Sequence, residues 1–125
     1  MTEQDVQNWL DEYGRAWVDG DPDRVVMLFT DTATYRETPF DDPMRGRHEI
    51  REYWQNNAAD AQEDVKFTSQ VWAVKNNTGI AGWQARFTEK ASGGRVELDG
   101  TFRLVFSSEQ GAFQCAILEE WWHSR

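Results

Sequence analysis

Four long segments in the second half of the chain alternate between apolar and polar residues. They are Val65 to Lys75, Ile80 to Glu89, Arg95 to Phe106 and Ala112 to His123. A period of two is typical of β-strands that bury one face. The connections at 76–79, 92–94 and 107–111 are short, so neighbouring strands should pair antiparallel as hairpins. The chain therefore predicts a four-stranded antiparallel meander.

The first half of the chain begins with a predicted helix. Apolar residues three and four positions apart indicate an amphipathic helix over about 2–19. Thr2 with Asp5 forms a start that resembles a capping box, and Gly20 supplies the end. This helix should lay its apolar face on the sheet.

Two further helices are predicted before the meander. Asp21 and Pro22 indicate the N-cap and first turn of a short helix that reaches Phe29. After Gly46, a third helix buries Ile50, Tyr53 and Trp54. The resulting fold class is α+β: one domain over 1–125, in which three helices from the N-terminal half cover one face of a curved antiparallel sheet.

A short strand between the second and third helices carries an acid on an apolar face. By the period-two rule this face holds Ala33, Tyr35, Glu37 and Pro39. The Asp41-Asp42-Pro43 sequence ends the strand, since proline cannot continue a ladder. In a chain with seven Trp, seven Phe and three Tyr, Glu37 is either a solvated edge charge or a base desolvated in a pocket. Both interpretations stay open.

A curved sheet closed by helices encloses a conical cavity, and the alternation predicts its lining. The expected aromatic wall consists of Tyr13, Trp17, Tyr35, Trp54, Trp83 and Phe87. Asp99 and Gly100 stand in the middle of a strand, where both residue types are unfavourable. They indicate either a β-bulge or kink that bends the sheet, in which Asp99 is only tolerated, or an aspartate that points into the cavity.

The sequence Glu119-Glu120-Trp121-Trp122 places one acid and one ring on each face of the last strand. Alternation from Leu118 directs Glu120 inward, although a bulge would invert the order. Which of Trp121 and Trp122 faces the pocket stays open, and either ring could instead lie in a dimer interface.

Charge and residue counts exclude several classes of function. The net charge of −9, without clustered Lys or Arg, argues against nucleic-acid binding. Cys115 is the only cysteine and predicts a buried, inert thiol in a reducing, cytoplasmic compartment. The two histidines form no His/Cys cluster, so no metal site is expected. No leader and no apolar run near 18 residues is present, so we expect no membrane span.

Several segments resemble the nuclear transport factor 2-like superfamily, most closely its SnoaL-like and ketosteroid isomerase-like branch. They are YGRAWVDGD at 13–21, ATYRETPF at 33–40, the Gly46-Arg47 entry to the third helix, and the closing meander. The resemblance covers about residues 5 to 123. It implies a cone-shaped sheet around a hydrophobic pocket, a hydrophobic small-molecule ligand and a homodimer.

The resemblance to ketosteroid isomerase also implies roles for single residues. Glu37 matches the general base, Tyr13 an oxyanion-hole donor, and Asp99 a second donor that is kept protonated. Trp54 replaces a supporting tyrosine, and Glu120 falls near a pocket tryptophan. The implied reaction is proton abstraction next to a carbonyl, without a cofactor, leading to isomerisation, cyclisation or dehydration. A noncatalytic pocket for a hydrophobic ligand and a protein-interaction module remain alternatives.

Overall fold

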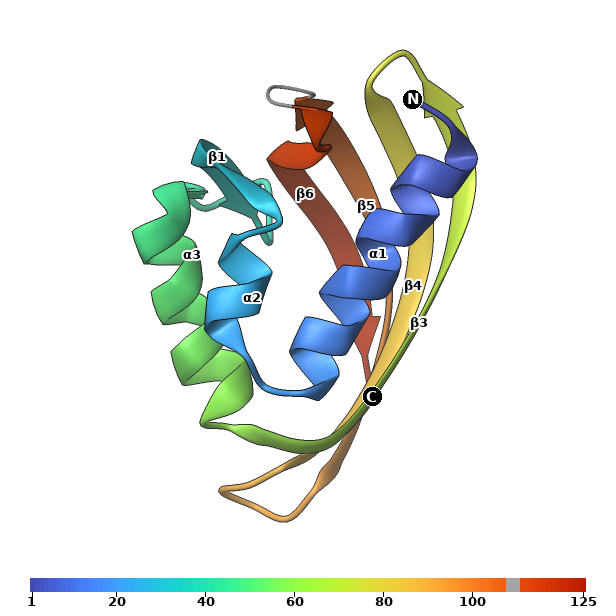
Figure 1. Ribbon diagram of the computed structural model, residues 1–125. Coiled ribbons are helices and arrows are strands. Elements are labelled where there is room, and N and C mark those ends of the chain that lie inside the picture. The colour runs from blue at the N-terminus through green and yellow to red at the C-terminus, as the bar shows by residue number, and fades with distance from the viewer. Residues whose placement is uncertain (108–110) are drawn as a thin grey trace.

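A computed structural model of the chain describes residues 1–107 and 111–125 (Figure 1). The elements of the N-terminal half are α1 (Glu3–Val18), α2 (Pro22–Val26), β1 (Phe29–Arg36), β2 (Met44–Arg45), α3 (Gly46–Trp54) and the π-helix η1 (Gln55–Ala59). The C-terminal half contains β3 (Gln62–Lys75), β4 (Thr78–Glu89), β5 (Arg95–Ser107) and β6 (Gln114–Ser124). The predicted connection at 107–111 lies partly outside the described residues.

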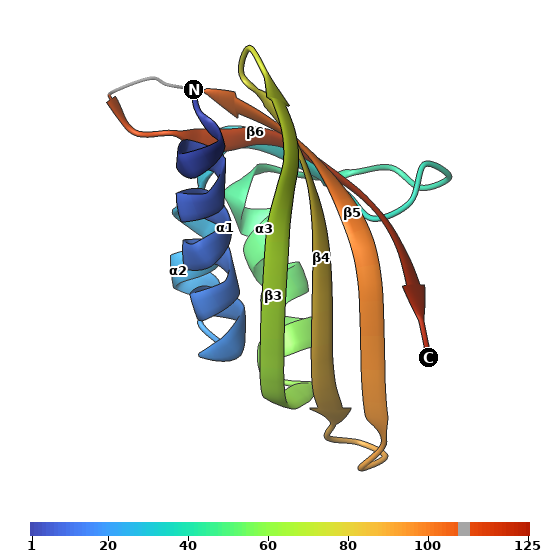
Figure 2. The ribbon, with the colours of Figure 1, turned by 90° about the vertical axis from the view of Figure 1, so that its right-hand side faces the viewer.

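The strands form one curved sheet with the order β2-β1-β6-β5-β4-β3. The neighbours from β3 to β6 pair antiparallel, which confirms the predicted meander. Figures 1 and 2 show α1, α2 and α3 on one side of this sheet, in the hollow of its curve. The α+β cone predicted from the sequence is therefore the fold of the protein.

The parallel pairing of β1 with β6 was not predicted. Tyr35 lies opposite Leu118, and Arg36 lies opposite Glu119. This pairing also explains why α2 is shorter than expected. Phe29 is fully buried and starts β1 opposite Cys115, so the helix that was predicted to reach Phe29 ends at Val26.

The helix ends follow the local sequence signals. The Thr2 hydroxyl accepts from the Asp5 N–H at 3.1 Å, and the Asp5 carboxylate accepts from the Thr2 N–H at 2.8 Å, which completes the capping box. Gly20 follows the helix with a φ of 62°, a left-handed conformation that favours glycine. Asp21 caps α2 by accepting from the Arg24 N–H at 3.2 Å. No helix in the described part of the chain is both long and apolar enough to cross a bilayer.

The β1 strand ends earlier than the alternation predicted. It stops at Arg36, whose guanidinium donates to the carbonyl of Asp41 and closes the following turn. The predicted strand positions Glu37 and Pro39 therefore lie beyond the strand. The pairing with β2 covers only Thr34 and Tyr35, so nothing extends the ladder past Arg36 on that side.

The core between α1 and the sheet is built from rings. The Tyr13 ring alone contacts five other rings at centroid distances of 5.2 to 6.2 Å, those of Trp9, Trp17, Trp54, Phe67 and Phe102. Rings in such edge-to-face and stacked pairs add specific geometry to their burial. The position of α1 on the sheet is thereby fixed.

The outer face of the sheet carries two of the seven tryptophans. Trp72 is 55% exposed and lies over Gly82, and Trp121 is 49% exposed. Trp121 lies opposite Thr101 in the ladder, and Gly82 lies opposite Thr101 from the other side. The expected homodimer stays a prediction.

Candidate active site

A pocket with a volume of about 350 Å³ lies between the helices and the concave face of the sheet. The helices line it with Tyr13, Trp17, Tyr53 and Trp54. The sheet lines it with Tyr35, Trp83, Phe87 and Trp122. Three carboxyl groups, those of Glu37, Glu89 and Glu120, complete its polar part. Pockets with aromatic walls and few convergent polar groups are typical of small-molecule sites.

The parallel pairing of β1 with β6 brings two of these carboxyl groups together. Arg36 and Glu119 are register partners and point away from the pocket side, on which Tyr35 and Leu118 are buried. One step further along both chains, Glu37 and Glu120 therefore turn toward the same side of the sheet. Both side chains line the pocket.

Glu120 is the buried member of this pair. It is 6% exposed, although it is a carboxyl group in the middle of β6. Its carboxyl group has no hydrogen-bond partner within the described residues. Burial raises the pKa of Glu120 well above its usual value, and the negative charge of Glu37 raises it further. Both effects favour the protonated form of Glu120.

Glu37 is the accessible member of the pair. It is half-buried at the first position after β1. Partial burial raises the pKa of Glu37, the nearby Tyr53 hydroxyl lowers it in part, and the charge of Asp41 raises it. A carboxylate in this environment is more basic than one in water and is still in contact with solvent.

Tyr13 and Tyr35 form a buried pair of hydroxyl groups. Their oxygens are 2.9 Å apart, and the side chains are 1% and 2% exposed. Burial, followed by the negative charge of Glu120, raises the pKa of both phenols well above the usual value of 10.0. The two hydroxyls carry two protons, and one of these protons forms the hydrogen bond between the two oxygens. The second proton is available to a ligand atom in the pocket.

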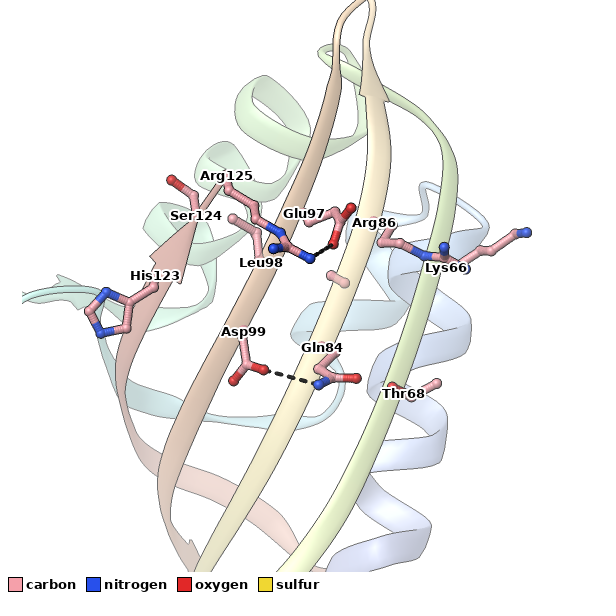
Figure 3. Close-up of a pocket in the computed structure, with 11 residues that line it drawn as sticks. Lys66, Thr68, Gln84, Arg86, Glu97, Leu98, Asp99, His123, Ser124 and Arg125 are labelled. Carbon is pink, nitrogen blue, oxygen red and sulfur yellow. Dashed lines mark hydrogen bonds and ion pairs between the residues drawn. The ribbon is translucent and has the colours of Figure 1, made fainter.

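The prediction that Asp99 points into the pocket is wrong. Asp99 is exposed on the outer face of the sheet, where its carboxylate accepts from the Gln84 side-chain amide at 3.0 Å (Figure 3). The register through Asp99 and Gly100 is continuous, so no bulge interrupts the ladder there. Alternation from the buried Phe102 sends Gly100 inward and Asp99 outward.

The presence of glycine at position 100 has a different explanation: the ring of Trp83 packs against this residue. A Cβ atom at position 100 would lie 2.6 Å from two atoms of that indole. The absence of a side chain lets the Trp83 ring lie flat against β5 and stack on Phe102 at a centroid distance of 5.1 Å. The glycine therefore shapes the floor of the pocket.

Asp99 belongs to a second hollow, on the outer face, with a volume of about 470 Å³. It is larger than the inner pocket, but its walls are mostly exposed polar side chains such as Lys66, Arg86 and Arg125 (Figure 3). The inner pocket is the better candidate, because buried ionisable groups with raised pKa values and aromatic walls meet there.

Eight predicted site residues lie in the inner pocket: Tyr13, Trp17, Tyr35, Glu37, Trp54, Trp83, Phe87 and Glu120. Their roles stay predictions. Trp122 faces the pocket and Trp121 the outer surface. The sequence analysis missed Tyr53 and Leu98 as lining residues. Alternation from Phe102 could have found Leu98, whereas Tyr53 looked like an ordinary core residue. Among the described residues, no three His, Cys, Asp or Glu side chains are grouped to hold a metal ion.

The comparisons with known proteins agree with this architecture. The family model of the SnoaL-like domain matches residues 6–113. No curated protein sequence matches the chain. A similar solved structure is that of the epoxide hydrolase/cyclase-like enzyme SalBIII, with 24% identity, a TM-score of 0.80, and coverage of 97% of this chain and 92% of that chain.

Two further structures share the fold at lower identity. One is a nuclear transport factor 2-like superfamily protein from Salmonella enterica, with 13% identity, coverage of 95% and 89%, and a TM-score of 0.79. The other is a ketosteroid isomerase-like protein from Erwinia carotovora, with 18% identity, coverage of 94% and 93%, and a TM-score of 0.73. The chain belongs to the SnoaL-like domain family and shares its fold with a nuclear transport factor 2-like superfamily protein.

Proposed function

We propose that the inner pocket is the active site of an enzyme that needs no cofactor and moves protons between its substrate and two glutamates. Glu37 removes a proton from the substrate. Glu120 and the Tyr13–Tyr35 pair donate to the substrate oxygen on which negative charge develops. One observation carries the proposal: two carboxyl groups share a pocket whose surroundings leave one accessible and bury the other, which raises the pKa of the buried one.

Glu37 suits the role of general base because its pKa is raised toward neutrality while it stays in contact with the pocket. A base whose pKa approaches the working pH is strong and is still ionised. Such catalysis is worth about 10²- to 10⁴-fold in rate. Asp99 cannot contribute to the donors, so Glu120 takes the part that the resemblance gave to Asp99.

The donors suit an oxygen that gains charge. Tyr13 and Tyr35 together have one hydroxyl proton that their own hydrogen bond does not use, and Glu120 in its protonated form would offer another. Buried donors of this kind are typically worth about 10²- to 10³-fold each, because they are already oriented before charge develops. In proton abstraction next to a carbonyl, the C–H electrons move toward the carbonyl oxygen. These donors would stabilise the resulting enolate until Glu37 returns the proton to another carbon.

The same groups also suit ring closure. SalBIII is described as an epoxide hydrolase/cyclase-like enzyme with a role in pyran ring formation. In such a step Glu37 would take the proton of an attacking hydroxyl, its oxygen would bond to an epoxide carbon, and the C–O bond of the epoxide would break. Glu120 would give its proton to the departing oxygen. Proton exchange with water in the emptied pocket would then restore both glutamates.

The base can be tested with 5-nitrobenzisoxazole, an uncharged ring compound that opens when a base removes its ring proton. The proton passes to the base, the N–O bond breaks, and a coloured cyanophenolate is released. We expect the wild-type protein to accelerate this reaction, and Glu37→Gln to lower kcat/KM by about 10²-fold or more. The rate should rise with pH through the raised pKa of Glu37.

The matched control is Glu63→Gln, which removes an exposed carboxylate that does not line the pocket. This variant should keep the wild-type rate, and circular dichroism should show that all three proteins are folded. A wild-type rate in Glu37→Gln, or no acceleration by the wild-type protein, would contradict the proposal and favour a pocket that only binds its ligand.

A further inference from the structure

The inner pocket has a one-sided charge distribution. None of its described lining residues is Lys, Arg or His, whereas three are glutamates. The pKa directions agree with this composition. For Tyr13, Tyr35, Tyr53, Glu37 and Glu120, every neighbouring charge that acts on the group is acidic and raises its pKa.

This distribution has a consequence for ligands that carry negative charge. A carboxylate or phosphate in the pocket would lose its hydration and would meet the Glu37 carboxylate without a cation to compensate it. An unpaired charge in a partly desolvated site is costly, and a like charge nearby adds to that cost. A ligand without charge avoids both penalties.

The walls and the inner polar groups constrain the rest of the ligand. Trp17, Trp54, Trp83 and Trp122 present rings to the pocket, and three of them are 4 to 6% exposed. Rings of this size favour flat apolar groups. At the Tyr13–Tyr35 pair, the hydroxyls and Glu120 offer free donor protons. An uncharged oxygen with lone pairs matches these donors, whereas an ammonium group carries only protons of its own.

We propose that the pocket selects its ligand by charge. It accepts an uncharged ring compound whose carbonyl, ether or epoxide oxygen faces Glu120 and the two tyrosines. It rejects carboxylates and phosphate esters of the same shape. The inference rests on the proposed function only for the choice of pocket. Any reaction that supplies this substrate must therefore release it without a free carboxylate or phosphate next to the ring.

A pair of ligands with one ring system tests the charge selection directly. 2-Acetonaphthone carries a ketone and 2-naphthoate carries a carboxylate at the same ring position. Isothermal titration calorimetry of the wild-type protein at pH 7.5 should show binding of 2-acetonaphthone, with 2-naphthoate at least about tenfold weaker. Equal or tighter binding of 2-naphthoate would overturn the inference, and so would a failure of 2-acetonaphthone to bind.

A second test asks whether an added positive charge makes the pocket bind anions. Asn57 is exposed and lines the pocket. Asn57→Lys should therefore place a cation at the pocket without disturbing the core. We expect it to tighten the binding of 2-naphthoate several-fold and to leave 2-acetonaphthone unchanged. Asn56→Lys is the control, because Asn56 is exposed in the same π-helix but does not line the pocket. Equal gains in both variants would show a nonspecific charge effect and contradict the inference.

These measurements separate the inference from the proposed function, because they need no turnover. Selective binding of 2-acetonaphthone together with a Glu37→Gln variant that opens 5-nitrobenzisoxazole at the wild-type rate would overturn only the proposed function. Binding of both naphthalene ligands with equal affinity, together with a Glu37-dependent rate, would overturn only the inference on charge.

Discussion

Glu37 directly follows β1, Glu120 lies in the neighbouring parallel strand β6, and the charge of Glu37 raises the pKa of Glu120 in the pocket that they share. Glu120 is nearly inaccessible, whereas Glu37 is only half-buried. Two like groups in one site are thereby placed in environments that favour different protonation states. The acid and the base of the proposed reaction follow from this difference.

Glu120 should make the stability of the protein depend on pH. Its pKa in the folded protein lies above the usual value of 4.5 that applies to the unfolded chain. Above that pH the unfolded chain releases the proton while the folded protein keeps it, so the free energy of unfolding falls as pH rises toward the folded pKa. Glutamine has no such proton. Glu120→Gln should therefore gain stability relative to the wild-type protein as pH rises from 4.5 toward the folded-state pKa of Glu120.

Urea unfolding of both proteins at several pH values measures this difference. Below pH 4.5 the difference should become constant, because Glu120 is then protonated in both the folded and the unfolded state. Glu119→Gln is a useful control, since Glu119 is on the outer face and pairs with Arg103 at 2.6 Å. A stability difference for Glu120→Gln that does not change with pH would contradict a neutral, buried Glu120.

The Tyr13–Tyr35 pair should show strong coupling in a double-mutant cycle. Either single change to phenylalanine leaves the other hydroxyl buried without its partner at 2.9 Å, which should cost about 1 to 3 kcal/mol. The double variant removes both hydroxyls, so its cost should be smaller than the sum of the two single costs. Thermal or urea unfolding of the four proteins gives the coupling, and additive costs would argue against the hydrogen bond.

Gly100→Ala should destabilise the protein by about 1 to 3 kcal/mol, because the new Cβ atom would displace the Trp83 ring from the pocket floor. Gly82→Ala is the matched comparison on the opposite face. Its Cβ atom would meet the ring of Trp72, which is 55% exposed and can swing into solvent. The Gly82→Ala variant should therefore lose less stability. Equal losses would show that the Trp83 contact is not what requires Gly100.

Asp99→Asn should change neither the rate with 5-nitrobenzisoxazole nor the stability by more than about 0.5 kcal/mol. Asp99 lies on the outer face, and asparagine can still accept from the Gln84 amide. A large loss of kcat/KM in this variant would restore the role that the resemblance to ketosteroid isomerase assigned to Asp99. Kinetic assays of Asp99→Asn and Glu37→Gln, run in parallel, make the comparison.

Local signals in the sequence were enough for most of the fold. The capping box at Thr2, the proline start of α2 and the period-two meander each depend on neighbouring residues, and each was confirmed. The parallel pairing of β1 with β6 depends on contacts about 80 positions apart, between residues such as Tyr35 and Leu118. No local pattern encodes such a pairing.

The site was predicted only in part, because local patterns reveal some of its residues but not the contacts between distant segments. Alternation within one strand directed Glu120 inward correctly, because its neighbour Leu118 is a core residue. For Asp99 the resemblance to a family outweighed the alternation, and the alternation from Phe102 was the better guide. The proximity of Glu37 to Glu120, which gives the site its chemistry, required the parallel pairing and could not be read from the chain.

The protonation states of Glu37 and Glu120 are the centre of this account, and a carboxyl titration by NMR measures them most directly. With ¹³C-labelled glutamate, the Glu37→Gln and Glu120→Gln variants assign the two side-chain carboxyl signals. Both should titrate above 4.5, with Glu120 the higher of the two, and Glu37→Gln should lower the pKa of Glu120. A Glu120 signal that titrates at 4.5 or below, unchanged in Glu37→Gln, would contradict the account.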